Sequence, residues 1–160
     1  MIRFNADEIF EMAEQIERNG AKFYRKAAES ADDAGRDLLL RLADMEDDHE
    51  KTFAAMRAEL ADAEARPLTF DPYDEATRYL QTMADGEVFG VDPSASLSGQ
   101  EPLEDILTTA IGLEKDSIVF YQSMKVLVPE RAGKERLDAI IKQEIGHILD
   151  LTDQLRALTT

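Results

Sequence analysis

Apolar residues recur at intervals of three and four along most of the chain, which is the pattern of helices with one buried face. Four long segments carry it, at about 6–30, 34–63, 102–127 and 132–158. The first segment begins with Asn5 as its expected N-cap and Glu8 three residues later, which is a capping-box arrangement. The third segment opens with Pro102, and proline fits the first turn of a helix. No segment shows the alternation of a half-buried strand.

A long connection separates the second helical segment from the third. Residues of about 64–101 contain one expected short helix near 73–84, followed by the Gly-, Pro- and Ser-rich run DGEVFGVDPSASLSGQEP. The other two connections are short, so the helices that they join should be antiparallel neighbours. Two antiparallel pairs joined by one long crossover make the ferritin-like version of a four-helix bundle. The pattern therefore predicts an all-α, antiparallel four-helix bundle, with residues 1–160 as a single domain.

Polar residues interrupt the buried faces at corresponding places in the two halves of the chain. The segments IERNGAKFY (16–24) and LEKDSIVFY (113–121) share an apolar residue, then a glutamate, and later a Phe-Tyr pair. The second and fourth helical segments share Glu-x-x-His, as EDDH (46–49) and EIGH (144–147). The two halves therefore use one pattern twice.

These polar residues predict a site for two metal ions. Residues three apart lie on one face of a helix, so the Glu and the His of each Glu-x-x-His can both point inward. Buried carboxylates would each face several kcal/mol of desolvation unless cations balanced their charge. One such residue alone would fit a solvated or hydrogen-bonded core role, but the complete set matches a known dimetal design. The predicted ligands are Glu17, Glu46, His49, Glu114, Glu144 and His147.

Other side chains are expected near this site. Tyr24 and Tyr121 lie two helical turns after the two lone glutamates, where a phenol could hydrogen-bond a ligand or supply a proton or an electron. They are therefore candidate catalytic residues, and an ordinary amphipathic core role fits them equally well. Gly20 and Ser117 are small and would leave space beside the metals for a diatomic substrate, although Gly20 would also allow close helix packing. Weaker candidates for an extra ligand or an imidazole partner are Glu50, Asp116 and Asp150.

Composition narrows the classes of function. The 160 residues include no cysteine, which excludes disulfides, thiolate zinc sites and Cys-ligated iron centres. Oxygen and imidazole ligands suit iron or manganese, and zinc is also compatible. The formal net charge of −16 makes nucleic acid and anionic membrane surfaces poor partners. No apolar run could span a membrane, and MIRFNADEIF has no apolar signal-peptide core, so we expect a cytoplasmic protein.

The helix pattern and the Glu, Glu-x-x-His, Glu, Glu-x-x-His set resemble the ferritin-like superfamily, and the rubrerythrin-type di-iron domain most closely. The resemblance implies two iron ions, with Glu46 and Glu144 placed to bridge them and Glu17 and Glu114 more terminal. It also implies reduction of hydrogen peroxide or O2. Rubrerythrins typically carry a second, Cys-ligated iron domain that delivers electrons, so this chain would need an external electron donor. Many of them also have a glutamate where this chain has Ser117.

Three functions remain open at this point. The first is a di-iron oxidoreductase that uses peroxide or O2 as its oxidant. The second is a ferroxidase that serves iron storage or delivery, and it would use the same ligands. The third is a non-catalytic helical bundle whose site holds zinc or no metal. In each case we expect a homodimer or a larger homo-oligomer, because bundles of this type commonly pair through an exposed apolar helix face.

Overall fold

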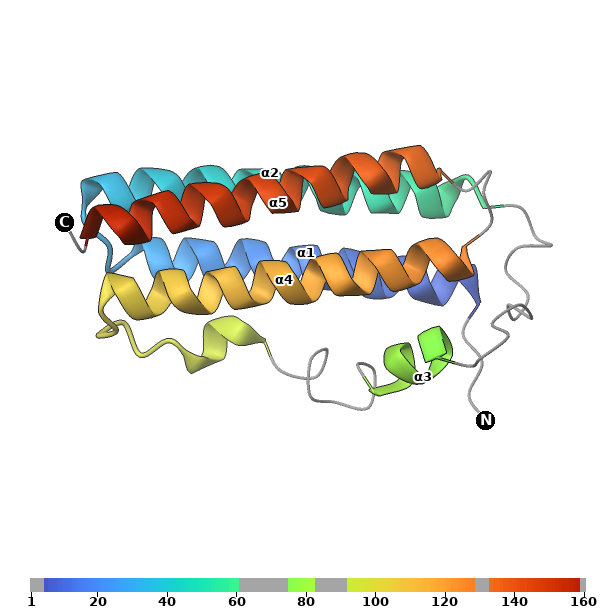
Figure 1. Cartoon of the computed structure of the whole chain (residues 1–160), viewed down its shortest axis with the longest axis horizontal. Helices are drawn as coiled ribbons and strands as arrows, with labels where there is room; N and C mark the ends of the chain where they lie inside the picture. Colours follow the sequence, from blue (N-terminus) through green and yellow to red (C-terminus); the bar gives the residue numbers. More distant parts are fainter. Residues whose placement is uncertain (1–4, 61–74, 83–91, 129–132, 159–160) are drawn as a thin grey trace.

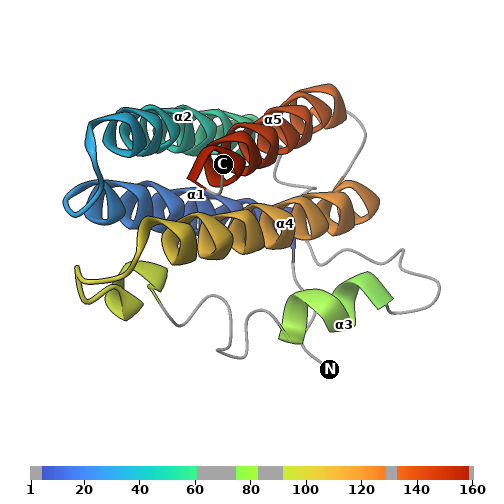
Figure 2. The same ribbon diagram turned by 60° about the vertical axis from the view of Figure 1, so that its left-hand side comes forward.

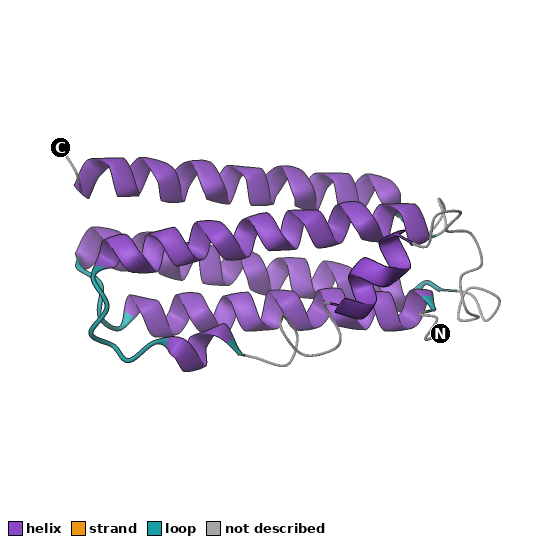
Figure 3. Ribbon diagram, turned by 60° about the horizontal axis from the view of Figure 1, so that its bottom comes forward, coloured by secondary structure: helices purple, strands orange, loops and turns teal. Residues whose placement is uncertain are grey.

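Four long helices form the body of the protein (Figure 1). The computed structural model describes residues 5–60, 75–82, 92–128 and 133–158. The long helices are α1 (Ala6–Ala28), α2 (Asp33–Ala58), α4 (Leu103–Leu127) and α5 (Lys134–Leu158). The segment between α2 and α4 contributes α3 (Glu75–Thr82) and a short 3-10 helix, η2 (Pro93–Ser96). All of these elements are helical (Figure 3), as the apolar pattern predicted.

The long helices lie in two layers of two. The pair α2 and α5 forms one layer, and α1 and α4 form the other, as Figures 1 and 2 show from two directions. The helices α1 and α4 run in opposite directions, so residues late in one lie beside residues early in the other. The described parts of the connection between α2 and α4 lie against this second layer, where α3 packs against α4 and η2 packs against α1.

The helix starts follow the capping signals in the sequence. The Glu8 backbone N–H donates to Asn5 Oδ1 at 2.8 Å, and the Asn5 N–H donates to Glu8 Oε2 at 2.9 Å, which completes the predicted capping box. The helix α2 starts in the same way, because the Asp32 side chain accepts a hydrogen bond from the Gly35 N–H. Caps of this kind typically stabilise a helix by about 1 kcal/mol.

Two apolar clusters fill the interior, one on each side of the polar residues. The first includes Phe10, Phe53, Phe120, Met124 and Leu137. The second includes Phe23, Leu39, Leu42, Leu107 and Leu151. Each long helix contributes to both clusters and carries its Glu or Glu-x-x-His between those contributions. The polar residues therefore occupy the middle of the bundle, enclosed by apolar packing at both ends.

Some predicted boundaries are wrong. The second helix was expected to continue to about residue 63, but α2 ends at Ala58. The chain tightens there, because the Leu60 N–H bonds to the Arg57 carbonyl at 3.1 Å and Leu60 then packs against the first cluster. The first helix ends at Ala28, and Pro102 is the N-cap of α4, immediately outside the helix. Residues 73, 74, 83 and 84 of the expected short helix lie outside the described residues. None of the described helices is both long enough and apolar enough to cross a membrane.

Candidate dimetal centre

The six predicted ligand residues meet at the centre of the bundle. Each is at most 4% exposed, and Glu17 and Glu144 are fully buried. Buried acidic and imidazole side chains are uncommon in a core unless they are paired or bind a metal. Their side chains come from four different helices, so the site exists only when the bundle is folded.

The six side chains form two overlapping groups. One comprises Glu17, Glu46, His49 and Glu144, and the other comprises Glu46, Glu114, Glu144 and His147. Within each group, one ligand atom per residue lies within 4.8 Å of every other. Glu46 and Glu144 belong to both groups, whereas each remaining residue belongs to one. This is the arrangement of two neighbouring metal positions that share two carboxylates.

Both imidazoles turn Nδ1 toward the carboxylates. The Nδ1 atom of His49 lies 3.2 Å from Glu144 Oε1 and 3.5 Å from Glu17 Oε2. The Nδ1 atom of His147 lies 2.9 Å from Glu144 Oε2 and 3.2 Å from Glu114 Oε1. The two rings stack, with centroids 5.6 Å apart and planes inclined by 18°. The stacking brings the two Nδ1 atoms close together, that of His49 in the first group of ligands and that of His147 in the second.

Two tyrosines hold the terminal glutamates. The Tyr121 hydroxyl donates to Glu17 Oε1, and the Tyr24 hydroxyl donates to Glu114 Oε1. Both tyrosines are almost completely buried. Burial and the neighbouring carboxylates raise the pKa of each phenol well above its usual value, so both phenols stay protonated and act as donors. The structure therefore places both candidate tyrosines against the carboxylates, each on the glutamate of the opposite helix.

The pKa values of the buried acids and imidazoles show how strongly their charges interact. Burial, followed by repulsion between neighbouring carboxylates, raises the pKa of Glu17 and Glu46 and brings that of Glu144 to about 7. Burial alone would lower the pKa of the imidazoles. The close approach of the carboxylates outweighs burial and raises the pKa to about 11 for His49 and about 12 for His147. Protons on these groups therefore provide positive charge that bound cations could replace.

The residues fit a pair of divalent cations. Several buried atoms have no hydrogen-bond partner among the described residues: Glu17 Oε2, Glu46 Oε1, His49 Nδ1, His147 Nε2 and both carboxylate oxygens of Glu144. Unpartnered buried polar atoms are rare in folded proteins, and a cluster of them needs an explanation. All six atoms belong to residues of the two groups. Two divalent cations would balance four carboxylates while the imidazoles remain neutral.

The weaker candidates lie elsewhere. Glu50 pairs with Arg18 at 2.8 Å, and Asp150 pairs with Arg41 at 3.2 Å, so both are surface ion-pair residues. Asp116 is exposed on α4 and belongs to neither metal-binding group. The interpretation of these three acids as ligands or imidazole partners is therefore not supported.

Sequence reasoning missed one partner of the site. The Nε2 atom of His49 lies 2.9 Å from Oε1 of Gln143 on α5. A hydrogen bond at this atom fixes the ring and leaves Nδ1 for a metal, which is a common way of orienting a histidine ligand. The position of Gln143, next to Glu144 in the sequence, is the one signal that could have indicated it.

Comparison with known proteins supports the architecture. No protein-family profile matches the sequence, and a search of curated proteins finds no match. One crystal structure from Thermotoga maritima, provisionally described as a ferritin-like diiron-carboxylate protein, is similar with a TM-score of 0.72 at 24% sequence identity. The similarity covers 98% of this chain and 97% of that chain. The chain has the ferritin-like fold. This confirms the predicted bundle with its long connection between the second and third long helices.

Proposed function

We propose that the protein is a di-iron oxidoreductase that reduces hydrogen peroxide or O2 with electrons from an external donor. The observation that carries the proposal is that Glu46 and Glu144 belong to both metal-binding groups. Two shared carboxylates would hold two ions next to each other, and a pair of iron ions there would supply two electrons to one small oxidant. The oxygen and nitrogen ligand set suits iron, and the structurally similar protein is described as a diiron-carboxylate protein.

The protein side chains would have three tasks in this reaction. Glu46 and Glu144 would bind both ions, and each of the remaining four ligands would bind one of them. The apolar clusters on both sides keep bulk water away from the centre. Reduction of peroxide to two waters takes up two protons together with the two electrons. Tyr24 and Tyr121 keep their own protons and hold the carboxylates of Glu114 and Glu17 in place through Oε1, so we expect the two protons to come from solvent.

The function is tested by anaerobic titration with Fe(II), followed by oxidation. We expect about two irons per chain, consistent with two groups of ligands, and then a diferric absorption band after addition of peroxide or O2. The Glu46→Ala, Glu144→Ala double variant should bind no iron, because it removes both shared carboxylates. Glu50→Ala is the matched control, since this glutamate lies on the same helix as Glu46 but pairs with Arg18.

Three results would contradict this function. Normal iron binding by the double variant would show that the ions are held elsewhere. Incorporation of many irons per chain would support storage instead. Exclusive binding of zinc by protein produced with ordinary iron supply would support a non-catalytic bundle.

A further inference from the structure

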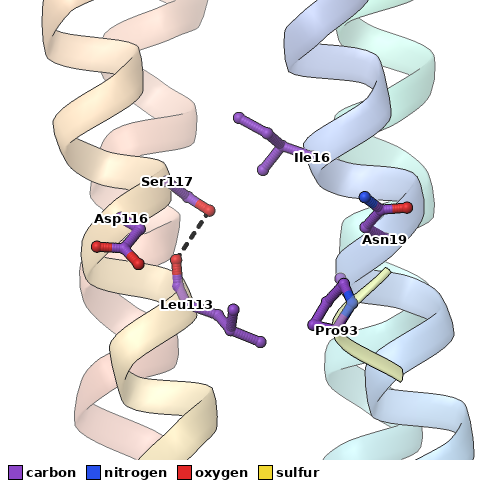
Figure 4. Close-up of a pocket in the computed structure, with 7 residues that line it drawn as sticks. Ile16, Asn19, Pro93, Leu113, Asp116 and Ser117 are labelled. Carbon is purple, nitrogen blue, oxygen red and sulfur yellow. Dashed lines mark hydrogen bonds between the residues drawn. The ribbon is translucent and has the colours of Figure 1, made fainter. Parts of the chain in front are cut away.

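A small hollow lies between α1 and α4, beside the dimetal centre. Its volume is about 60 Å³. It is lined by Ile16, Asn19 and Gly20 from α1, Leu113, Asp116 and Ser117 from α4, and Pro93 from η2. Figure 4 shows Leu113 and Ser117 of α4 on the side toward α1, opposite Ile16, with Pro93 beside α1. None of the six proposed metal ligands lines this hollow.

Gly20 forms the boundary between the hollow and the metal ligands. A Cβ atom placed on Gly20 would lie 3.4 Å from Cγ, Cδ and Oε2 of Glu46. Gly20, which lines the hollow, therefore packs directly against one of the two shared carboxylates. Gly20 is therefore the residue of the lining that separates a molecule in the hollow from Glu46.

The chemistry of the lining selects the kind of molecule that fits. The surface is mostly apolar, and its hydroxyl is occupied, because Ser117 Oγ donates to the Leu113 carbonyl at 3.1 Å (Figure 4). Oδ1 of Asn19 accepts a hydrogen bond from Gln15 at 2.7 Å. The charged residue of the lining, Asp116, is exposed. An anion would lose its hydration here without replacement and would be repelled by the nearby carboxylates, whereas desolvation costs much less for a small uncharged molecule.

The outer edge of the hollow is fixed to α1. Lys26 Nζ donates to the Ser94 carbonyl at 2.7 Å, and the side chain of Asp92 accepts from the Ser94 N–H at 2.9 Å. Lys22 Nζ lies 3.9 Å from Asp92. These contacts hold Pro93, the first residue of η2, against α1 at the edge of the hollow.

We propose that this hollow is the entry and resting site of a small uncharged oxidant, O2 or H2O2, and that Gly20 and Ser117 set its size. The inference rests on the proposed function, because it needs a redox centre for the oxidant to reach. A space of about 60 Å³ holds a molecule of a few heavy atoms, since one water needs roughly 10–15 Å³ on such a scale. Larger oxidants would be excluded by size and anionic ones by charge.

A second hollow competes with this assignment. It has a volume of about 160 Å³, lies between α2 and α5, and is lined by Met45, Asp48, His49, Thr52 and Gln143. It reaches the centre only at His49, whose Nε2 atom already faces Gln143. A ligand there would meet the outer edge of the imidazole ring rather than a shared carboxylate. We therefore assign oxidant entry to the hollow between α1 and α4.

The test compares Ser117→Leu with Thr52→Leu. Each hydroxyl bonds to the carbonyl four residues earlier on its helix, so the two variants lose similar contacts but fill different hollows. In iron-loaded Ser117→Leu we expect oxidation by O2 and by H2O2 to slow at least ten-fold, with the iron content unchanged. Thr52→Leu should oxidise at the wild-type rate. Gly20→Ala gives a milder second probe, with a slowing of several-fold, and Gly112→Ala is its control because a Cβ there meets open space.

Xenon binding supplies a readout that does not depend on iron chemistry. Metal-free crystals under xenon pressure should show a peak between α1 and α4 in the wild-type protein and in Thr52→Leu, but not in Ser117→Leu. Slowing of only one oxidant in Ser117→Leu would identify that oxidant as the one using the hollow. Absence of the wild-type xenon peak, equal slowing in Thr52→Leu, or unchanged rates in both Ser117→Leu and Gly20→Ala would overturn the inference. Failure of the wild-type chain to bind two irons would instead overturn the proposed function.

Discussion

The hydroxyl of Tyr121 on α4 donates a hydrogen bond to the carboxylate of Glu17 on α1. The reverse contact also exists, because Tyr24 of α1 donates to Glu114 of α4. These two contacts cross the bundle at its centre and join the first helix pair to the second. In each contact the tyrosine hydroxyl bonds to Oε1, so Oε2 of the same carboxylate is available for another partner. Oε2 of Glu17 lies 3.5 Å from Nδ1 of His49.

We predict that Tyr121→Phe weakens one metal position selectively. Removal of the donor to Glu17 should reduce metal affinity at the Glu17–His49 position by 10–100-fold, the usual effect of losing a partner of a ligand. It should also lower the free energy of unfolding of the metal-free protein by about 1 kcal/mol. Tyr24→Phe should have the same effects at the Glu114–His147 position. Competitive metal titration would resolve the two affinities.

Tyr79→Phe is the control for these variants. Tyr79 is only half-buried on α3 and packs against the first apolar cluster, away from the glutamates. Equal loss of affinity at both metal positions in Tyr121→Phe would contradict the role of this hydroxyl as the partner of a single carboxylate.

Metal stoichiometry should separate the shared ligands from the terminal ones. Glu144→Ala removes a carboxylate from both groups, so we expect it to retain no ion after desalting. Glu17→Ala removes a ligand from one group only and should retain about one ion per chain, by the same count of groups. Elemental analysis of the desalted proteins measures this directly. Retention of one ion by both variants would mean that the two carboxylates are not used differently.

The helices and the six polar residues of the centre could be predicted because both depend on local spacing. Periodicity places the apolar face of each helix, and a spacing of three places Glu and His on that face. The end of α2 could not be predicted, because no Gly or Pro follows Ala58 until Pro67 and the helix stops where Leu60 meets the core. That contact depends on packing between segments far apart in sequence.

The two tyrosine–glutamate contacts between α1 and α4 could not be predicted from the sequence either. Each tyrosine follows the glutamate of its own helix by two turns, but seven residues of helix span about 10 Å, which is too far for a direct bond. Because α1 and α4 are antiparallel, Tyr24 lies level with Glu114, and Tyr121 lies level with Glu17. The repeat places these residues symmetrically, but only the packing of the two helices decides which tyrosine meets which glutamate. The contact of Gln143 with His49 likewise depends on how α2 and α5 pack.

Loss of the Gln143 contact should affect one metal position and spare the other. Gln143→Leu removes the acceptor at Nε2 of His49, so the ring loses its fixed orientation, and we expect about ten-fold weaker binding at the Glu17–His49 position. Lys142→Leu is the control, because it makes the same replacement at the neighbouring exposed residue of α5. Competitive titration applies here too, and unchanged affinity in Gln143→Leu would show that packing alone orients the ring.

The pH dependence of stability should differ between metal-free and metal-loaded protein. In the metal-free protein, the folded pKa of Glu144 is about 7, above the ordinary value of 4.5. Between pH 4.5 and about pH 7, Glu144 loses its proton in the unfolded chain but keeps it in the folded chain. The free energy of unfolding therefore falls as the pH rises through this range. The imidazoles act in the same direction, because their stabilisation is complete below pH 6.5 and is lost as pH rises toward about 11 for His49.

We therefore predict that the metal-free protein is more stable at pH 5.5 than at pH 8.5. Surface carboxylates such as Glu101, whose hydrogen bonds lower its pKa to about 2, give the opposite slope only at more acidic pH, so they do not mask the trend. Bound cations replace the protons, so the rise in Tm on metal loading should be larger at pH 8.5 than at pH 5.5. Calorimetry with and without chelator measures both trends. Glu144→Gln should flatten the metal-free slope between pH 4.5 and 7, because an amide cannot ionise, and an unchanged slope in this variant would assign the trend to other groups.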